Sequence, residues 1–226
     1  MTLFGDDLGP ESGISSNPEG GRVPFDVAGT TVTVDGKAAP LLYVQHGQIN
    51  FIAPWSLRSD LSRVPICVTR NTDTSCLDAL AISTAAGFFM ANSTIAAINQ
   101  DGTINSQQHP SPPGSYVSLY VTGIGPLPGS SVDGALAGLP LQPFTGTTSV
   151  GIWTSAACIG SVMPGLCDVD PLEVLYAGSA PTLVNGVNVV IVRIPSTIRT
   201  GERWLIASFT AGDTSSVASG YLWLGP

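Results

Sequence analysis

Two stretches of this chain repeat one pattern at a long interval. Residues 1–10 (MTLFGDDLGP) recur as residues 117–126 (VSLYVTGIGP), and in both a strand-like run leads into a Gly-Pro loop. Three more motif pairs follow in the same order: Leu42-Tyr43 with Leu175-Tyr176, residues 50–54 with residues 191–195, and residues 73–75 with residues 213–215. A repeat of this length predicts two tandem copies of one structural unit, each of roughly 100 residues.

The composition indicates that these units consist of short strands and many turns. Only 11% of the residues are charged, and the chain contains 26 Gly and 18 Pro. An ordinary domain has about 25% charged residues. Apolar and polar residues alternate in runs that recur about every eight to twelve residues, which is typical of a β-sandwich or a β-barrel. Because no long helical periodicity interrupts this pattern, we expect an all-β chain.

The alternation also predicts the domain boundaries. We place a first β-domain at residues 1–83 and a second at residues 114–226, with a disulfide-bearing insertion in the second. The segment between them, residues 84–113, is too apolar for a free linker and is expected to be a hairpin packed on the junction. Asp35-Gly36 between two alternating runs predicts a hairpin turn in the first domain.

The four cysteines form two pairs with the same spacing, Cys67/Cys76 and Cys158/Cys167. If the chain turns at Asn71-Thr72, positions whose numbers sum to 143 face each other, and Cys67 lies directly opposite Cys76. We therefore expect a local disulfide within each pair, each adding roughly 2 to 3 kcal/mol of stability.

Two further observations support disulfides over a metal site. Aligning the Asp-Thr-Ser motifs of the two copies places Cys67 and Cys76 on Ala207 and Ser216, so both cysteines are lost together. A zinc site typically has more closely spaced cysteines and histidines nearby in the sequence. The only histidines are His46 and His109. We predict no metal and no cofactor.

The charge and the cysteines restrict the compartment and the partners. Paired structural cysteines indicate an oxidising environment, so we expect an extracellular or cell-surface protein. Its export signal is expected upstream of Met1, in a longer gene product. The net charge is −8 with eight scattered Lys and Arg, which disfavours nucleic acid and anionic membranes as partners. No apolar run approaches the ~18 residues that a membrane span needs.

Four motifs together resemble a known family. They are residues 36–44 (GKAAPLLYV), 47–55 (GQINFIAPW), 99–106 (NQDGTINS) and 120–126 (YVTGIGP). These motifs are similar to the Solibacter-type uncharacterised C-terminal domain, which closes large exported proteins of soil acidobacteria. The resemblance spans nearly the whole chain and implies two immunoglobulin-like (TIG-like) β-sandwich domains. It implies no chemistry, because the family has no established activity.

Catalytic constellations are not evident in the sequence. His46 and His109 lie in turns, and neither accompanies a nucleophile elbow. The candidate carboxylates are adjacent on a strand or lie in loops, and we interpret them as solvated charges: Asp6, Asp7, Asp168, Asp170 and Glu173. The loop at residues 123–129 resembles a phosphate-binding loop, but Pro126 and Pro128 have no N–H to offer a phosphate.

Residues 99–105 reproduce the middle of a calcium-binding loop. The first and twelfth positions of that loop would be Ala97 and Gln108, so both end carboxylates are missing. A type I′ turn at Asp101-Gly102 explains the same residues, and we expect the site to be metal-free.

The tryptophans are the remaining candidate binding residues. Any of Trp55, Trp153, Trp204 and Trp223 could stack on a sugar, and Trp153 is the best candidate for exposure. Trp55, the second candidate, and Trp223 also fit a packing role. The sequence favours a non-catalytic surface or secreted module for adhesion, display or assembly. A carbohydrate-binding module that uses exposed tryptophan is the alternative, and a hydrolase is a remote one. The expected partners are a protein or a glycan at the cell surface, or a second copy through the strand edge at residues 1–4, where the opening strand is short.

Overall fold

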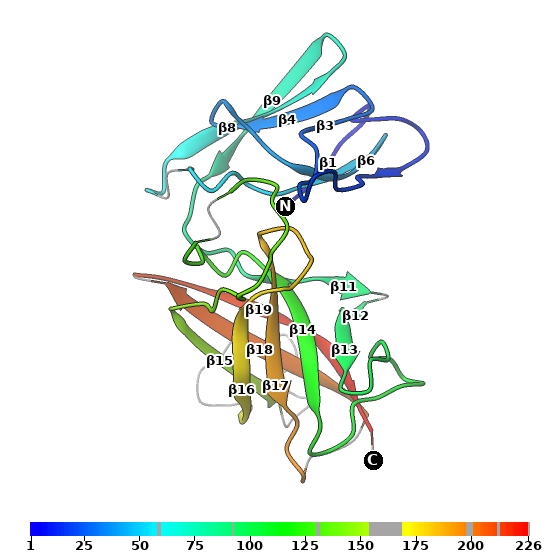
Figure 1. The fold of residues 1–226 in the computed structure, drawn as a ribbon, viewed down its shortest axis with the longest axis vertical. Coiled ribbons are helices and arrows are strands. Elements are labelled where there is room, and N and C mark those ends of the chain that lie inside the picture. The colour runs from blue at the N-terminus through cyan, green and yellow to red at the C-terminus, as the bar shows by residue number, and fades with distance from the viewer. Residues whose placement is uncertain are drawn as a thin grey trace. The chain divides into compact units, whose positions relative to one another are not determined.

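The computed structural model describes residues 1–57, 60–91, 93–129, 132–153, 169–197, 201–211 and 213–225. Within them every regular element is a β-strand, and mainly antiparallel sheets form a sandwich-like arrangement (Figure 1). The prediction of an all-β chain is confirmed.

The chain divides into two compact units. Unit 1 contains Met1–Ser83, Gly129–Leu141 and Ala180–Gly186, and unit 2 contains Thr84–Pro128, Gln142–Ser179 and Val187–Pro226. Unit 1 thus takes two segments from the predicted second domain. The predicted connecting segment, residues 84–113, belongs to unit 2.

Unit 1 is formed by two antiparallel sheets. One has the order β1-β7-β6-β2, and the other has the order β3-β4-β8-β9 with β5 also paired to β4. Their bounds are β1 Thr2–Phe4, β2 Ile14–Ser15, β3 Asp26–Val27, β4 Thr30–Val34, β5 Lys37–Ala38, β6 Leu41–Gln45, β7 Gln48–Phe51, β8 Arg63–Arg70 and β9 Asp73–Leu80. One apolar cluster joins the sheets; its members include Val32, Leu41, Ile49 and Phe51, each fully buried.

Unit 2 is dominated by one large sheet, with the order β10-β14-β17-β16-β15-β18-β19-β12-β11 and β13 paired to β14. The bounds are β10 Gly87–Phe88, β11 Met90–Ala91, β12 Thr94–Ile95, β13 Ala97–Asn99, β14 Tyr116–Thr122, β15 Thr147–Trp153, β16 Val169–Ser179, β17 Val187–Arg193, β18 Gly201–Ala211 and β19 Thr214–Leu224. Strand β16 makes the sheet continuous because its first part pairs with β15 and the rest with β17.

The registers of the two units establish the internal repeat. Leu3 pairs with Ile49 in unit 1, and Leu119 pairs with Val190 at the corresponding place in unit 2. Both units also carry a register shift at the same point of the next strand pair, between Leu41 and Tyr43 and between Val174 and Tyr176. A bulge at a fixed position re-aims the strand that carries it. Strands β1-β7-β6 and β14-β17-β16 are therefore equivalent, as the sequence motifs predict.

The second sheets of the two units are equivalent as well, and their registers correct one detail of the alignment. Two rows of directly paired residues correspond: Lys37, Val34, Ile66 and Leu77 in unit 1, and Asp170, Ile152, Leu205 and Gly220 in unit 2. One row further, Cys67 and Cys76 correspond to Ile206 and Ser219. The predicted counterparts, Ala207 and Ser216, do not face each other, because the aligned Asp-Thr-Ser motifs lie differently at the two turns: Asp73 pairs with Arg70 in β8, whereas Asp213 precedes Thr214, the first paired residue of β19.

Unit 1 depends on the two segments that come from later in the chain. Leu136 pairs with Val184 to join the segments, and Ala135 pairs with Arg22. Gly186 approaches Ile52 so closely, at a φ of 107°, that a Cβ there would stand 3.0 Å from Ile52 Cγ2. Only glycine tolerates both conditions.

The predicted hairpin turn at Asp35-Gly36 is confirmed by the φ angles of its two central residues. Asp35 has a φ of 51° and Gly36 a φ of 73°. Positive φ at both central residues is the mark of a type I′ turn, whose twist matches that of the flanking strands β4 and β5.

Candidate functional site at the edge of strand β9

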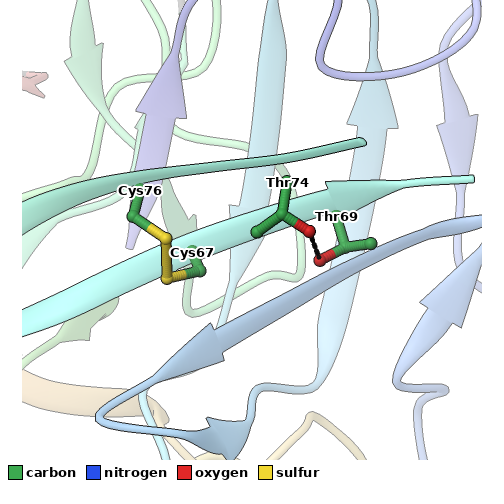
Figure 2. Close-up of a disulfide and its surroundings, with 4 residues drawn as sticks. All are labelled: Cys67, Thr69, Thr74 and Cys76. Atoms are coloured by element: carbon green, nitrogen blue, oxygen red, sulfur yellow. Dashed lines mark hydrogen bonds between the residues drawn. A yellow bond between two sulfur atoms is a disulfide. The ribbon is translucent and has the colours of Figure 1, made fainter. Parts of the chain in front are cut away.

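The β8–β9 hairpin has the register that the sequence predicts. The strands meet at Asn71, which takes a φ of 55°, and Cys67 lies opposite Cys76. The two sulfurs form a disulfide with a Cα–Cα distance of 4.1 Å. Figure 2 shows the disulfide beside the hydroxyl contact of Thr69 with Thr74, which is 2.9 Å long. The first predicted disulfide is therefore confirmed, while Cys158 and Cys167 lie outside the described residues.

We expect removal of this disulfide to weaken unit 1 without changing its fold. The bond closes a short loop in the unfolded chain, so replacing both cysteines by alanine should lower the free energy of unfolding by about 2 to 3 kcal/mol. Denaturant unfolding of the double variant, compared with a Thr69→Val variant as a neighbouring control, measures the difference. An unchanged unfolding midpoint would contradict the prediction.

Strand β9 is the last strand of its sheet, and half of its backbone groups point away from the sheet. Ala81 donates its N–H to Ser62 O, on the side of β8. Because the direction of the backbone groups alternates along an antiparallel strand, the N–H and C=O groups of Ala79, Leu77, Ser75 and Asp73 also point toward β8. The short Cα–Cα distance of the disulfide agrees, because facing residues that do not bond through their backbones lie closest. The residues between them direct N–H and C=O outward: Thr74, Cys76, Asp78 and Leu80. We call these groups the β9 edge.

The side chains along the β9 edge are also accessible. Every residue of β9 except Ala79 is exposed, and Leu77 and Leu80 are exposed by 48% and 56%. Leu77 pairs with Ile66, which is buried in the core, so the side chain of Leu77 lies on the core face of the sheet, at its open edge. In the described residues no strand pairs with the outer side of β9. An open edge with apolar side chains is a template for another strand.

The predicted opening edge is present at the other sheet of unit 1. Strand β1 ends that sheet, and Phe4 is 75% exposed. β1 contains three residues, whereas β14, its equivalent, contains seven. Self-association through residues 1–4 stays a prediction.

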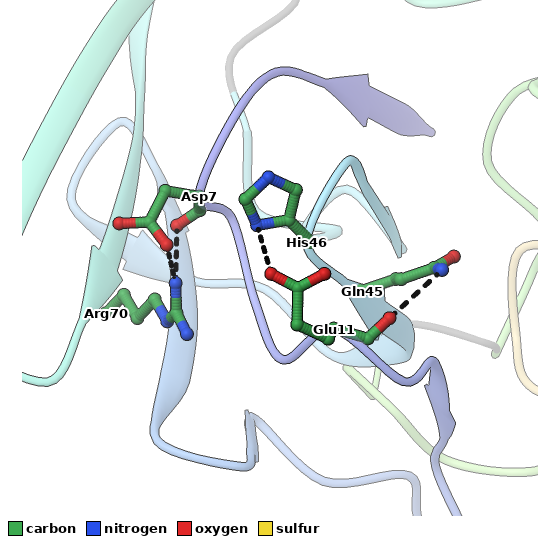
Figure 3. Close-up of polar contacts among 5 residues, drawn as sticks. All are labelled: Asp7, Glu11, Gln45, His46 and Arg70. Carbon is green, nitrogen blue, oxygen red and sulfur yellow. Dashed lines mark hydrogen bonds and ion pairs between the residues drawn. The ribbon is translucent and has the colours of Figure 1, made fainter.

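A polar cluster lies near the opening strand (Figure 3). Arg70 forms an ion pair with Asp7, and it also donates to the Asp7 carbonyl oxygen at 3.2 Å. His46 Nδ1 lies 3.5 Å from a Glu11 carboxylate oxygen, and Gln45 donates to the Glu11 carbonyl at 3.3 Å. These exposed contacts tie the loop after β1 to neighbouring strands. Asp7 is thus engaged by Arg70 in this cluster.

The calcium-like motif forms a buried polar network. Asn99 donates to the His109 carbonyl at 2.7 Å and to Thr103 Oγ1 at 3.0 Å, and it accepts from Ser111 Oγ at 2.6 Å. Asn105 donates to the Trp223 carbonyl at 2.8 Å and accepts from the Trp223 N–H at 2.9 Å. Asn99, Asn105 and Ser111 are all buried. The motif therefore ties residues 99–111 to strand β19.

The turn in this motif differs from the prediction. Gly102 has a φ of 84°, but Asp101 is not in the left-handed region, so the turn is not type I′. Gly102 N bonds to Asn99 O, and Asn99 N bonds to Thr103 O. These two bonds define a three-residue hairpin loop with glycine in its left-handed position. The correction arises because the loop is one residue longer than a type I′ turn allows.

The Asp101 carboxylate is engaged within this loop. It accepts from Thr103 Oγ1 at 2.6 Å and from Thr103 N at 3.0 Å. The hydroxyl of Thr103, with its N–H, lowers the pKa of Asp101 below 3.8. This small contribution to stability is present above the unfolded pKa and is lost as the pH falls through the lowered value. In the described part of the chain, no three His, Cys, Asp or Glu side chains gather as a metal site would require.

The other residues that the sequence singled out are dispersed. Trp55 is half-buried, and its backbone N–H donates to Asp133 at 2.8 Å. Its indole N–H is covered and has no hydrogen-bond partner among the described residues. Trp153 ends β15 opposite Val169, and its side chain lies outside the described residues. Glu173 pairs with Arg193 at 2.8 Å, and His109 is exposed. Sugar stacking by Trp55 or Trp153 stays a prediction.

The remaining tryptophans are Trp204 and Trp223, and the sequence predicts a packing role for Trp223. Trp204 meets Tyr221 edge to face at 4.7 Å between ring centres. Trp223 is half-buried and alternates with Leu222 and Leu224, which are buried in the core of unit 2. Both arrangements are those of packing residues.

Comparison of this chain with protein-family models, with curated proteins and with solved structures gives no match. A search of the described residues for a helix of the length and apolar character needed to cross a membrane also finds none.

Proposed function

We propose that this chain is a non-catalytic module that works outside the cytoplasm in adhesion, display or assembly, and that it binds protein strands along the β9 edge. The observation that carries the proposal is this edge, with four outward-facing residues on a hairpin that a disulfide holds in register. Strand addition to such an edge obtains affinity from backbone hydrogen bonds and specificity from alternate side chains.

The disulfide supports the compartment in this proposal. Cys67 and Cys76 form a bond that persists in oxidising surroundings and is rare in a reducing cytosol. The resemblance to the Solibacter-type C-terminal domain, which closes exported proteins, agrees with the same location and remains a proposal.

Binding of an extended peptide tests the proposed function. The probe is a labelled eight-residue peptide with alternating leucine and threonine and a lysine at each end, because β9 itself carries Asp73 and Asp78. We expect saturable binding to the dilute chain in fluorescence anisotropy, and loss of binding in an Asp78→Pro variant. Proline at position 78 removes an outward N–H and leaves the bonds to β8 in place.

Two controls make the result specific. A Glu19→Ala variant should bind the peptide as the unchanged chain does, because it also removes an exposed carboxylate of the same unit but keeps the backbone bonds of residue 19 with Arg22. A peptide of the same length, with proline in place of each threonine, should not bind. Equal binding by the Asp78→Pro variant would contradict the proposal, as would glycan binding that is lost in Trp55→Ala or Trp153→Ala with no peptide binding.

A further inference from the structure

The β9 edge has a counterpart in unit 2, where it is covered. The matching rows of paired residues place Leu77 of β9 on Gly220 of β19. Beside that position β12 pairs with β19, with Thr94 opposite Tyr221. Ile95 lies against Gly220 so closely that a Cβ there would stand 2.8 Å from Ile95 Cγ1. The short strand β12, which runs parallel to β19, thus covers this part of its edge and adds Ile95 to the core of unit 2.

Unit 1 has no such strand among its described residues. Where unit 2 has a glycine beneath a covering side chain, unit 1 has Leu77, which is 48% exposed. The internal repeat therefore shows both what the position accepts, a strand with an apolar side chain, and that this chain leaves it open in unit 1.

We propose that a second copy of this chain supplies the strand, by antiparallel pairing of β9 with β9 of its partner about a two-fold axis beside Leu77. The inference deepens the assembly role proposed above and rests on it. A two-fold contact places one surface against itself, so β9 must be complementary to its own sequence.

The charges, the outward-facing groups and the apolar side chain of Leu77 together favour one register. The outward groups belong to even-numbered residues, so each must face another even-numbered residue. Pairing Asp78 with Asp78 would oppose two carboxylates, which is unfavourable. Pairing Asp78 with Cys76 of the partner avoids this contact and places Leu80 opposite Thr74. In that register Leu77 lies directly opposite Leu77 of the partner.

The same register joins the core faces of the two copies. Leu77 occupies a facing position without backbone bonds, where opposed Cβ atoms lie about 4.5 to 5.5 Å apart. Four facing pairs with two backbone hydrogen bonds each give about eight bonds across the contact. A single strand pair of this length is smaller than the roughly 1,200 Å² of a standard interface, so the dimer should be weak. Because each copy carries a net charge of −8, added salt should strengthen it.

Sedimentation of the unchanged chain and of matched variants tests the contact. We expect a reversible monomer–dimer equilibrium that shifts to the dimer as concentration and salt rise. Leu77→Lys should raise the dissociation constant at least tenfold, because it opposes two ammonium groups on the axis. Leu80→Lys, on the opposite face, should have a smaller effect, and Phe4→Lys, on the β1 edge, should have none. Circular dichroism confirms that each variant is folded.

Disulfide trapping tests the register independently of affinity. A Leu77→Cys variant should form a covalent dimer under mild oxidation, with position 77 joined to position 77 in non-reducing peptide maps. A Ser75→Cys variant should not, because residue 75 would face residue 79 of the partner. A chain that stays monomeric at high concentration and salt overturns the inference, and so does a dimer that Phe4→Lys disrupts and Leu77→Lys does not.

The two proposals fail in distinguishable ways. A monomer that still binds the strand peptide, with loss in the Asp78→Pro variant, removes self-pairing and leaves the proposed binding module. A monomer that binds no peptide removes both. A dimer trapped through position 77 supports both, because it shows the β9 edge accepting a strand.

Discussion

Residues 1–83 produced alone should fail to fold stably, although they contain every named strand of unit 1. The segments 129–141 and 180–186 complete this unit. Without them Ile52, which is 6% exposed and lies against Gly186, would face solvent, and the backbone N–H of Val23 would lose its bond to Gly134 O. Burial of such a side chain contributes about 1.5 to 3 kcal/mol, and a small domain has only about 5 kcal/mol in total. The fragment should therefore show little cooperative unfolding in circular dichroism or calorimetry.

An Asp133→Ala substitution in the full chain should destabilise unit 1 less than this truncation does. It removes the carboxylate that accepts from the backbone N–H of Trp55 and leaves the two added segments in place. We expect it to stay folded, with unfolding of unit 1 at a lower denaturant concentration. A fragment of residues 1–83 that unfolds cooperatively near the midpoint of the intact chain would show that the added segments are dispensable.

The second large effect is expected at the buried polar network of unit 2. An Asn105→Ala variant leaves the Trp223 N–H without its acceptor and removes a donor to Ser111 and to the Trp223 carbonyl. Orphaned buried groups of this kind cost about 1 to 3 kcal/mol each. We expect the free energy of unfolding of unit 2 to fall by about 2 to 4 kcal/mol.

Denaturant unfolding followed by tryptophan fluorescence measures this loss, since Trp223 belongs to the network. A Gln107→Ala variant is the matched control, because Gln107 lies in the same loop and is exposed. It should change the stability by less than about 0.5 kcal/mol. Equal stabilities of the two variants would show that the network contributes nothing.

The sequence predicts the local and repeated features of this fold well. Cys67 and Cys76 face each other because a two-residue turn fixes the register of a hairpin. The equivalence of β1-β7-β6 with β14-β17-β16 follows from motifs that keep their order in both copies. Such features depend on neighbours in the chain or on a repeated pattern, and both are readable without a structure.

Features that depend on distant partners were not predictable in the same way. Asn99 and Asn105 are typical of a turn or a metal loop, and only the position of β19 shows that they hold a strand. The segments that complete unit 1 come from loops of the second copy, which no local pattern reveals. The sequence does not indicate the β9 edge, because whether a strand lies at the edge of a sheet depends on which other strands pair with it. Its one signal is that β9 carries Asp73 and Asp78 and no Val or Ile, whereas β8 carries Val64, Ile66 and Val68.

Residue-resolved amide hydrogen exchange along β9 tests the central claim most directly. In dilute solution the amides of Ser75, Leu77 and Ala79 should be protected by β8, while those of Thr74, Cys76, Asp78 and Leu80 exchange rapidly. At high concentration, or with the strand peptide, the second group should also become protected. Rapid exchange of these four amides under every condition would contradict the account, because it would show that the β9 edge accepts no strand.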